Sequence, residues 1–259
     1  MSAFFVYAQR KGDTQMASFH YSIKSGKKGT ARRHGGYILR EGSHSERADL
    51  VHASHGNLPT WAQDDPKAFW SMADRHERAN GATYREHEIA LPSELSQAQL
   101  IELAERLAQR LAGTKPYQYA IHAPEGTLGG IENPHVHLMC SDRVPDGIER
   151  TPDRTFSRYN PTRPAEGGCR KDSGGKSPME LRQEVTARRK LVADIQNEML
   201  AECGHSTRVD HRSLREQGLD RRAERHLGPL LIKEMADGEK VQYAAYRTGH
   251  DAGTPPVPR

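Results

Sequence analysis

The chain has 259 residues, with 38 Lys and Arg against 34 Asp and Glu, so its formal charge is +4 at pH 7. Hydrophobic residues make up 35% of the chain and the mean hydropathy is −0.85, which predicts that part of the chain is loop or tail. No apolar run is long enough to cross a membrane, and no basic segment precedes the short apolar run at the N-terminus. We therefore expect no membrane insertion, no signal peptide and a cytoplasmic protein.

The three cysteines, Cys140, Cys169 and Cys203, are far apart in the sequence and form no C-x-x-C pair. This spacing argues against a disulfide framework and against a zinc site built from thiolates. A metal ion would therefore need His and carboxylate ligands, and the chain has 14 histidines.

The first part of the chain shows two strand patterns, two helix patterns and a further strand. Aromatic and β-branched runs at 3–9 and 18–24 predict a pair of strands. An amphipathic segment at 30–42 predicts a short helix, weakened by Gly35 and Gly36. Apolar residues spaced three and four apart after Pro66 predict a helix that ends near Asn80, and residues 83–91 nearly alternate, which predicts a strand.

Ser96-x-x-Gln99 has the form of a capping box, and the apolar stripe behind it predicts a helix. Two strands at 117–123 and 134–141 follow, joined by a Gly-rich loop. We then expect a long surface segment at 144–177, a helix at 178–203 and a disordered tail. The fold class is α/β of the α+β type: a central antiparallel sheet of five strands flanked by helices, which we expect on one face.

The triplet His135-Val136-His137 lies in a predicted strand, where alternation directs both imidazoles to one face while Val136 and Leu138 point to the core. A hairpin would pair this strand with the one that carries His122 and bring three imidazoles together. Three imidazoles leave coordination positions open, as needed where a metal also holds a substrate oxygen. An exposed polar face is the alternative interpretation of the pair.

Glu86 and Glu88 share one face of the predicted strand at 83–91, with His87 and Ile89 on the other. Beside a metal, such a carboxylate could act as general base, as ligand or as the group that orients a histidine ring. A polar outer face of the sheet is again the alternative.

Two regions of the chain are strongly basic. Residues 24–40 contain six Lys or Arg and no acidic residue, and residues 150–190 contain eleven Lys or Arg against five Asp or Glu. Such stretches are typical of phosphate binding, with a solvated charged surface as the alternative. Tyr159, in the second region, offers a ring on which a base could stack.

Four blocks resemble, in order as well as content, the MobA/MobL group of plasmid mobilisation relaxases, also called MobQ-type: RRHGGYILREG, ERANGATYREHEIALP, AIHAPEGTLGGIENPHVHLM and DGIERTPDRTFSRYNP. Residues 208–229 are similar to the sequence that follows the catalytic core in that group. The resemblance implies the HUH relaxase fold, in which an antiparallel sheet is flanked by helices and a histidine triad binds Mn²⁺ or Mg²⁺. It also implies a relaxase domain at 1–230 and a C-terminal extension at 231–259 that is at least partly disordered.

Carried over by position, the resemblance makes Tyr37 the nucleophile and makes His122, His135 and His137 the metal ligands. It places Glu86 and Glu88 beside the metal, as base or as partners of the ligands, without deciding between these roles. The DNA-binding residues that we expect are Lys24, Lys27, Lys28, Arg32, Arg33, Arg40, Arg158 and Tyr159.

The resemblance implies an enzyme that nicks one DNA strand at a plasmid origin of transfer, stays bound to the 5′ end through its tyrosine and rejoins the ends after transfer. The expected partners are single-stranded DNA at that origin, relaxosome accessory proteins and the coupling protein of a type IV secretion system. Two alternatives remain open. One is a rolling-circle replication initiator or transposase with the same chemistry, and the other is a non-catalytic single-stranded-DNA-binding protein whose histidines hold a structural metal.

Overall fold

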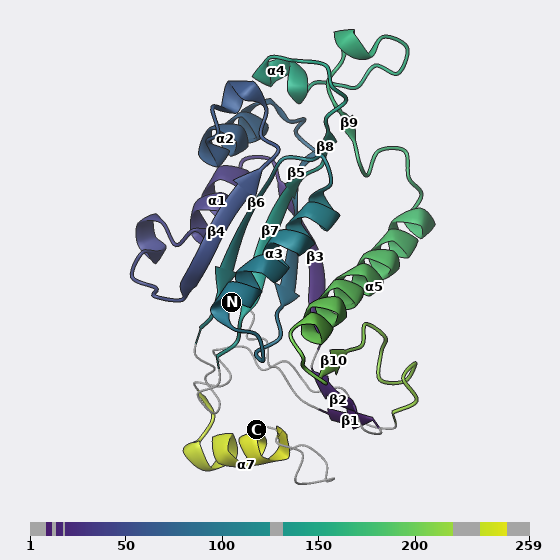
Figure 1. Ribbon diagram of the computed structural model, residues 1–259. Coiled ribbons are helices and arrows are strands. Elements are labelled where there is room, and N and C mark those ends of the chain that lie inside the picture. The colour runs from purple at the N-terminus through teal and green to yellow at the C-terminus, as the bar shows by residue number, and fades with distance from the viewer. Residues whose placement is uncertain (1–8, 12–13, 18, 125–131, 220–233, 248–259) are drawn as a thin grey trace.

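The central feature of the fold is an antiparallel sheet of five strands, seen in a computed structural model that describes residues 9–11, 14–17, 19–124, 132–219 and 234–247. The strands lie in the order β3-β5-β7-β6-β4, and each neighbouring pair is antiparallel (Figure 1). The predicted fold class and the predicted number of strands are therefore confirmed. The strands are β3 (Tyr21–Lys27), β4 (Leu50–Gly56), β5 (Ala82–Ala90), β6 (Tyr117–His122) and β7 (His135–Ser141).

The membership of the sheet differs from the prediction at one strand. Residues 3–8 of the predicted first strand lie outside the described residues, and Gln9 belongs to β1 (Gln9–Lys11). This short strand forms a separate small sheet with β2 (Thr14–Ala17) and β10 (Arg208–Val209). The fifth strand of the central sheet is instead β4, which lies at the edge and has no buried residue. An edge strand needs little apolar alternation, so LVHASHG gave no strand pattern.

Helices cover both faces of the sheet, and the prediction of one covered face is wrong (Figure 1). Helices α3 (Gln97–Ala112) and α5 (Pro178–Glu202) pack on one face, and α1 (Ala31–Ile38) and α2 (Pro66–His76) pack on the other. The reason is that the second face carries its own apolar residues, including Ala120 and Met139, which need cover. We call the two sides the α3/α5 face and the α1/α2 face.

The larger apolar core lies on the α3/α5 face. Ile121, Val136 and Leu138 point from the strands into it and are at most 1% exposed. Helix α3 meets them with the predicted apolar stripe, and the predicted capping box of Ser96 and Gln99 begins the helix. Burying one such side chain contributes about 1.5–3 kcal/mol, so this face accounts for much of the stability of the sheet.

The segment predicted as a long surface stretch at 144–177 is partly buried. It contains the end of β8 (Arg143–Val144), α4 (Pro152–Thr155), the 3₁₀ helix η3 (Pro164–Glu166) and β9 (Arg170–Lys171). Phe156 is fully buried in the core of the α1/α2 face. Arg143 ties the segment down, because its guanidinium pairs with Glu77 and donates to three backbone carbonyls, those of Phe156, Ser157 and Cys169.

Three elements complete the described residues: the 3₁₀ helices η1 (Gly42–His44) and η2 (Thr60–Ala62), and α7 (Asp237–Arg247). Helix α7 lies in the predicted C-terminal extension, whose last residues, from 248 on, fall outside the described part of the chain. Among the described helices, none is long and apolar enough to cross a membrane.

Candidate active site

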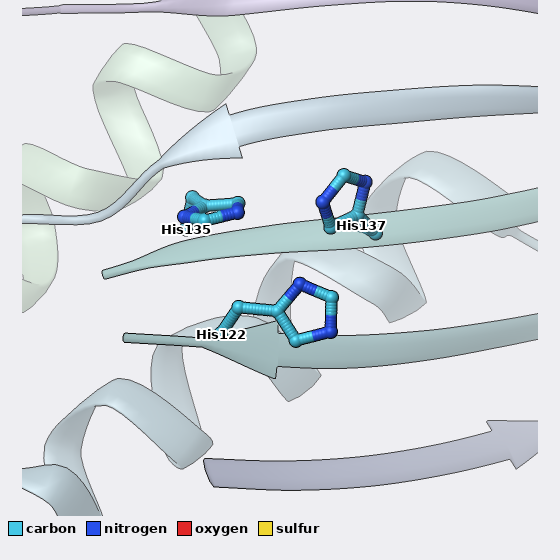
Figure 2. Close-up of side chains that lie close together, drawn as sticks. All are labelled: His122, His135 and His137. Carbon is cyan, nitrogen blue, oxygen red and sulfur yellow. The ribbon is translucent and has the colours of Figure 1, made fainter. Parts of the chain in front are cut away.

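The three predicted metal ligands come together on the α1/α2 face of the sheet (Figure 2). Alternation on β7 directs His135 and His137 to this face, and β6 pairs with β7 so that His122 lies opposite His135. The ring centroids are 4.9 to 5.5 Å apart, and one nitrogen from each ring lies within 4.8 Å of the others. All three side chains are buried, and the group could hold a metal ion.

Hydrogen bonds to the far side of two rings suit a metal site. The Nδ1 of His135 donates to the carbonyl oxygen of Asn133 at 2.9 Å, and the Nδ1 of His137 donates to Glu86 Oε1 at 2.8 Å. Because carbonyl and carboxylate oxygens only accept, the Nδ1 of each ring carries a proton, and Nε2 is the nitrogen left to bind a metal. Ligand histidines in metalloproteins are commonly oriented by such partners.

His122 is held differently from the other two histidines. Its Nε2 donates to the carbonyl oxygen of Ile38 at 2.7 Å, and its Nδ1 accepts from the Arg40 guanidinium at 3.0 Å. In this ring orientation, a metal at His122 would take Nδ1 in place of the contact with Arg40. Burial and the neighbouring His137 lower the pKa of His122 to about 3, and the same causes lower the pKa of His135 to about 4. Both rings are therefore neutral at pH 7, which is the form that binds metal.

Glu86 and Glu88 lie on β5, on the same face as the three histidines. Glu86 Oε1 accepts from both His137 and His34, each at 2.8 Å, and Glu88 accepts from Lys24. Burial alone would raise the pKa of each carboxyl, but these donors outweigh burial and hold both pKa values below the ordinary range. Glu86 is thus a partner of a predicted ligand, and Glu88 is the partner of a surface lysine.

Tyr37 lies at the C-terminal end of α1, next to the three histidines. Its half-buried ring is 6.5 Å from the ring of His137, in edge-to-face orientation, and 5.7 Å from the ring of His34. The ring of His44 lies 5.0 Å away. The fold therefore brings the predicted nucleophile to the predicted ligands, which follow it by 85 to 100 residues in the sequence.

Gly35 explains how α1 can lie so close to the sheet. A Cβ at this position would be 3.2 Å from the side chains of both Trp70 and Gln118, which is a tight contact. Instead, Gln118 donates to the carbonyl oxygen of Gly35 at 3.2 Å and accepts from the Trp70 indole at 2.7 Å. The other end of α1 is capped from α2, where the Asp74 carboxylate accepts from the backbone N–H groups of Gly29, Ala31 and Arg32.

Most of the predicted DNA-binding cations lie near this site. Lys24, Lys27, Lys28, Arg32 and Arg33 are exposed along β3 and α1. Arg40 is only 6% exposed, and its guanidinium forms two 2.7 Å bonds to Asp49. Arg158 and Tyr159 lie near the opposite end of β7 from His135, since Arg143, just beyond that end, binds the neighbouring carbonyl of Ser157. The structure does not bring these two residues to the histidines.

A groove of about 430 Å³ leads to Tyr37 between β3 and α1. Its walls combine the cations Lys27 and Arg33 with the rings of Tyr84, His34 and Tyr37, of which the first two stack at 5.2 Å. Gly26 makes room for Tyr84, because a Cβ there would overlap its ring. The groove thus offers positive charge and aromatic rings in the same place.

The sequence patterns do not indicate that His34, His44 and Asp49 belong to this site. His34 had one available sign, since it lies one helical turn before Tyr37 in a predicted helix. Its partner Glu86 is 52 residues away, and only the fold shows that contact.

Comparison with known proteins places this architecture in a family. The sequence model of the MobA/MobL family matches residues 36–236. The chain belongs to the MobA/MobL family. It is 44% identical over 209 residues to the "43 kDa relaxation protein" of Salmonella typhimurium, covering 80% of this chain and 56% of the relative. It is 40% identical over 235 residues to "Mobilization protein A" of Escherichia coli, covering 88% of this chain and 32% of the relative.

The chain therefore spans about half or less of the length of these two relatives. The fold is similar to that of a solved structure described as "Molecular Basis of Vancomycin Resistance Transfer in Staphylococcus aureus", with a TM-score of 0.57 and 22% identity. That similarity covers 75% of this chain and 98% of the solved one, and it shows that the two chains share a fold.

Proposed function

We propose that this MobA/MobL protein is a relaxase, which nicks one DNA strand at a plasmid origin of transfer and remains covalently bound to the 5′ end through Tyr37. The observation that carries the proposal is the position of Tyr37, whose ring lies 6.5 Å from that of His137 within a group of three buried histidines. The names of the two relatives, a relaxation protein and a mobilization protein, agree with this function.

The proposed reaction is a transesterification in which Tyr37 Oη attacks the scissile phosphorus. The bond from Oη to phosphorus forms, the bond from phosphorus to the DNA 3′ oxygen breaks, the phenol loses its proton and the 3′ oxygen gains one. A phenolate is a better leaving group than an alkoxide, since its parent pKa is about 10, so a DNA 3′-hydroxyl can later reverse the step. The proposed outcome is therefore strand transfer and resealing rather than hydrolysis.

His122, His135 and His137 would hold the divalent metal ion, Mn²⁺ or Mg²⁺. When bound, the ion would supply positive charge that orients the scissile phosphate and stabilises the transition state. Glu86 supports this role by fixing the ring of His137, and the carbonyl of Asn133 does the same for His135. Whether Glu86 or Glu88 also acts as general base stays a prediction, although Glu86 already accepts two hydrogen bonds.

Single-stranded DNA would approach Tyr37 through the groove between β3 and α1. Lys27 and Arg33 would contact phosphates there, and the exposed Lys24, Lys28 and Arg32 would extend the contact outward. In this proposal residues 1–230 form the nicking domain and 231–259 the extension. The protein would act in the cytoplasm with relaxosome accessory proteins and the coupling protein of a type IV secretion system.

The test of the reaction uses 5′- and 3′-labelled single-stranded oligonucleotides that tile the transfer origin, incubated with Mn²⁺ or Mg²⁺ and run on denaturing gels. The wild type should give a protein-linked 5′ end, with the nucleotide adduct on the Tyr37 peptide by mass spectrometry. Tyr37→Phe should bind the same DNA and form no adduct. Tyr117→Phe is the matched control, because it removes a hydroxyl on the opposite face of the sheet.

The outcomes separate the alternatives. An adduct on another tyrosine would refute the assignment of the nucleophile, and DNA binding without cleavage would favour a non-catalytic binding protein. Cleavage confined to a replication origin would favour an initiator or transposase.

The metal assignment has its own test. His135→Ala and His137→Ala should lose most of the Mn²⁺ binding seen by calorimetry while the fold is kept, because each removes one of three ligands. Unchanged affinity in both variants would exclude the triad as the metal site.

A further inference from the structure

We propose that His34 is a positioning residue that ties α1, and Tyr37 with it, to the predicted ligand His137 through Glu86. The inference rests on the proposed function for the roles of Tyr37 and His137. Its basis is one atom, Glu86 Oε1, which lies 2.8 Å from His34 Nε2 and 2.8 Å from His137 Nδ1. A carboxylate oxygen only accepts, so both rings donate to the same oxygen.

His34 is held from three directions. Its ring stacks with that of Tyr84 at 5.2 Å and with that of Tyr37 at 5.7 Å, while Nε2 contacts Glu86. Glu86 is fixed in turn, because it lies in the middle of β5 between two paired strands and its side chain is 5% exposed. The contact therefore joins a short helix to a rigid part of the sheet.

Helix α1 is marginally stable by itself, so this contact matters for its position. It contains the pair Gly35-Gly36, it is only eight residues long, and its N-terminal N–H groups are capped by Asp74 of α2 rather than by its own N-cap residue Thr30. Glycine within a helix favours the unfolded chain, and a helix of this length is marginal without tertiary contacts. His34 and Tyr37 are one turn apart, so a bond at His34 fixes the turn that carries the nucleophile.

Two substitutions separate the hydrogen bond from the ring stacking. His34→Phe keeps a ring between Tyr84 and Tyr37 but removes the donor, whereas His34→Gln keeps an N–H donor and removes the ring. The matched control is His55→Phe, because His55 donates in the same way to Asp64, at 3.0 Å, and lies on the edge strand β4. The side chains of His34 and His55 are similarly exposed, at 23% and 30%.

The first measurement is amide hydrogen exchange of the full chain, without metal or DNA. In His34→Phe, we expect the amides of α1 to exchange about tenfold faster than in the wild type, because the helix opens more often. His34→Gln and His55→Phe should stay close to the wild type. Glu86→Gln weakens the same bond from the other side, so the double variant with His34→Phe should add little to either single variant.

The second measurement is the rate of adduct formation. In His34→Phe, kcat should fall about 10- to 100-fold, since a small misplacement of a nucleophile has an effect of that size, while KM for the oligonucleotide stays the same. His34→Gln should restore most of kcat. A role in DNA binding would instead raise KM.

Wild-type exchange in His34→Phe would overturn the proposal. If His34→Gln loses protection at the same time, the effect belongs to ring stacking. The exchange measurement does not depend on catalysis. If the wild type forms no adduct, the relaxase proposal fails, and the exchange rates alone decide whether His34 holds α1.

Discussion

On β7, Val136 and Leu138 point toward α3 and α5, whereas His135 and His137 point toward α1. The same division holds on β5, where Ile89 enters the larger core and Glu86 lies among the histidines. Both faces are covered by helices and have an apolar core, but the α1/α2 face also carries the hydrogen-bonded site. Neighbouring residues of one strand thus have different roles, one in core packing and the next in the site.

The comparison shows how a sheet can hold a polar site rigidly. A ligand on a strand is fixed by its two apolar neighbours, which are locked into the core behind it. Buried polar groups on the α1/α2 face need hydrogen-bond partners, and each predicted ligand has one there, as His137 has in Glu86. Stability and site chemistry should therefore respond to different substitutions on the same strand.

Leu138→Ala tests the apolar face and should have the largest effect. Leu138 is 1% exposed, and truncation of such a side chain removes about 2–5 kcal/mol from the free energy of unfolding. Urea unfolding measures that loss, and calorimetry on the folded protein should find nearly unchanged Mn²⁺ affinity. His137→Ala is the counterpart, with the opposite pair of effects. Equal loss of metal affinity in both variants would show that the two faces are not independent.

The strand patterns predicted the fold well where a strand has one face in a core. Residues 134–141 and 83–91 alternate clearly, and both strands appear within one residue of the predicted bounds. Strand β4 was not predicted, because an edge strand without buried residues needs no alternating pattern. Cover on both faces was missed because Met139 and Ala120 share their face of the strands with polar residues such as His137 and Gln118.

The part of the site that depends on residue types and strand alternation could be predicted from the sequence. His122, His135, His137 and the same-face pair of glutamates follow from strand geometry, and Tyr37 came from the family resemblance alone. Long-range partners could not be predicted, because nothing in the sequence near Arg40 indicates that it would be buried against Asp49 and His122.

Glu86→Gln tests the hydrogen-bonded site on the α1/α2 face. Gln is a weaker acceptor than a carboxylate for the His137 N–H, and loss of such a partner typically lowers metal affinity 10- to 100-fold, or about 1.4–2.7 kcal/mol. Titration calorimetry with Mn²⁺ measures the change. Glu88→Gln is the control and should have a smaller effect, because Glu88 pairs with Lys24. A larger loss in Glu88→Gln would make Glu88, rather than Glu86, the group that matters for the metal.

His87 tests the α3/α5 face by pH. It is 2% exposed, and its Nδ1 forms a hydrogen bond of 2.8 Å with Tyr21 Oη. Burial, aided by the nearby Arg188, lowers the pKa of His87 to about 3. Below pH 6.5 the unfolded chain gains a proton at His87 and the folded chain does not, so stability falls as the pH falls.

This contribution reaches at most about 1.4 kcal/mol per pH unit between pH 6 and 4. In His87→Asn, the dependence of the free energy of unfolding on pH should be flatter than in the wild type, as measured by urea unfolding across this range. Parallel curves for the two proteins would mean that His87 gains its proton over the same pH range in the folded and the unfolded chain.

The smallest expected effect concerns the positive charge along the groove between β3 and α1. Lys27 and Arg33 line the groove that leads to Tyr37, so each should neutralise about one phosphate of a bound single strand. Neutralised phosphates release counterions, which makes the logarithm of the binding constant fall with the logarithm of salt concentration, with a slope of about −0.7 per phosphate. Replacing both residues with Ala should therefore make the slope shallower by about 1.4 in fluorescence anisotropy titrations.

The matched variant removes the same charge from the helices of the opposite face, at the exposed Arg110 of α3 and Arg182 of α5. It should leave the slope unchanged, because counterion release depends on contact with phosphate and not on the net charge of the protein. Equal slopes in the two double variants would place the DNA outside the groove. The strand would then have to reach Tyr37 by a path that avoids Lys27 and Arg33.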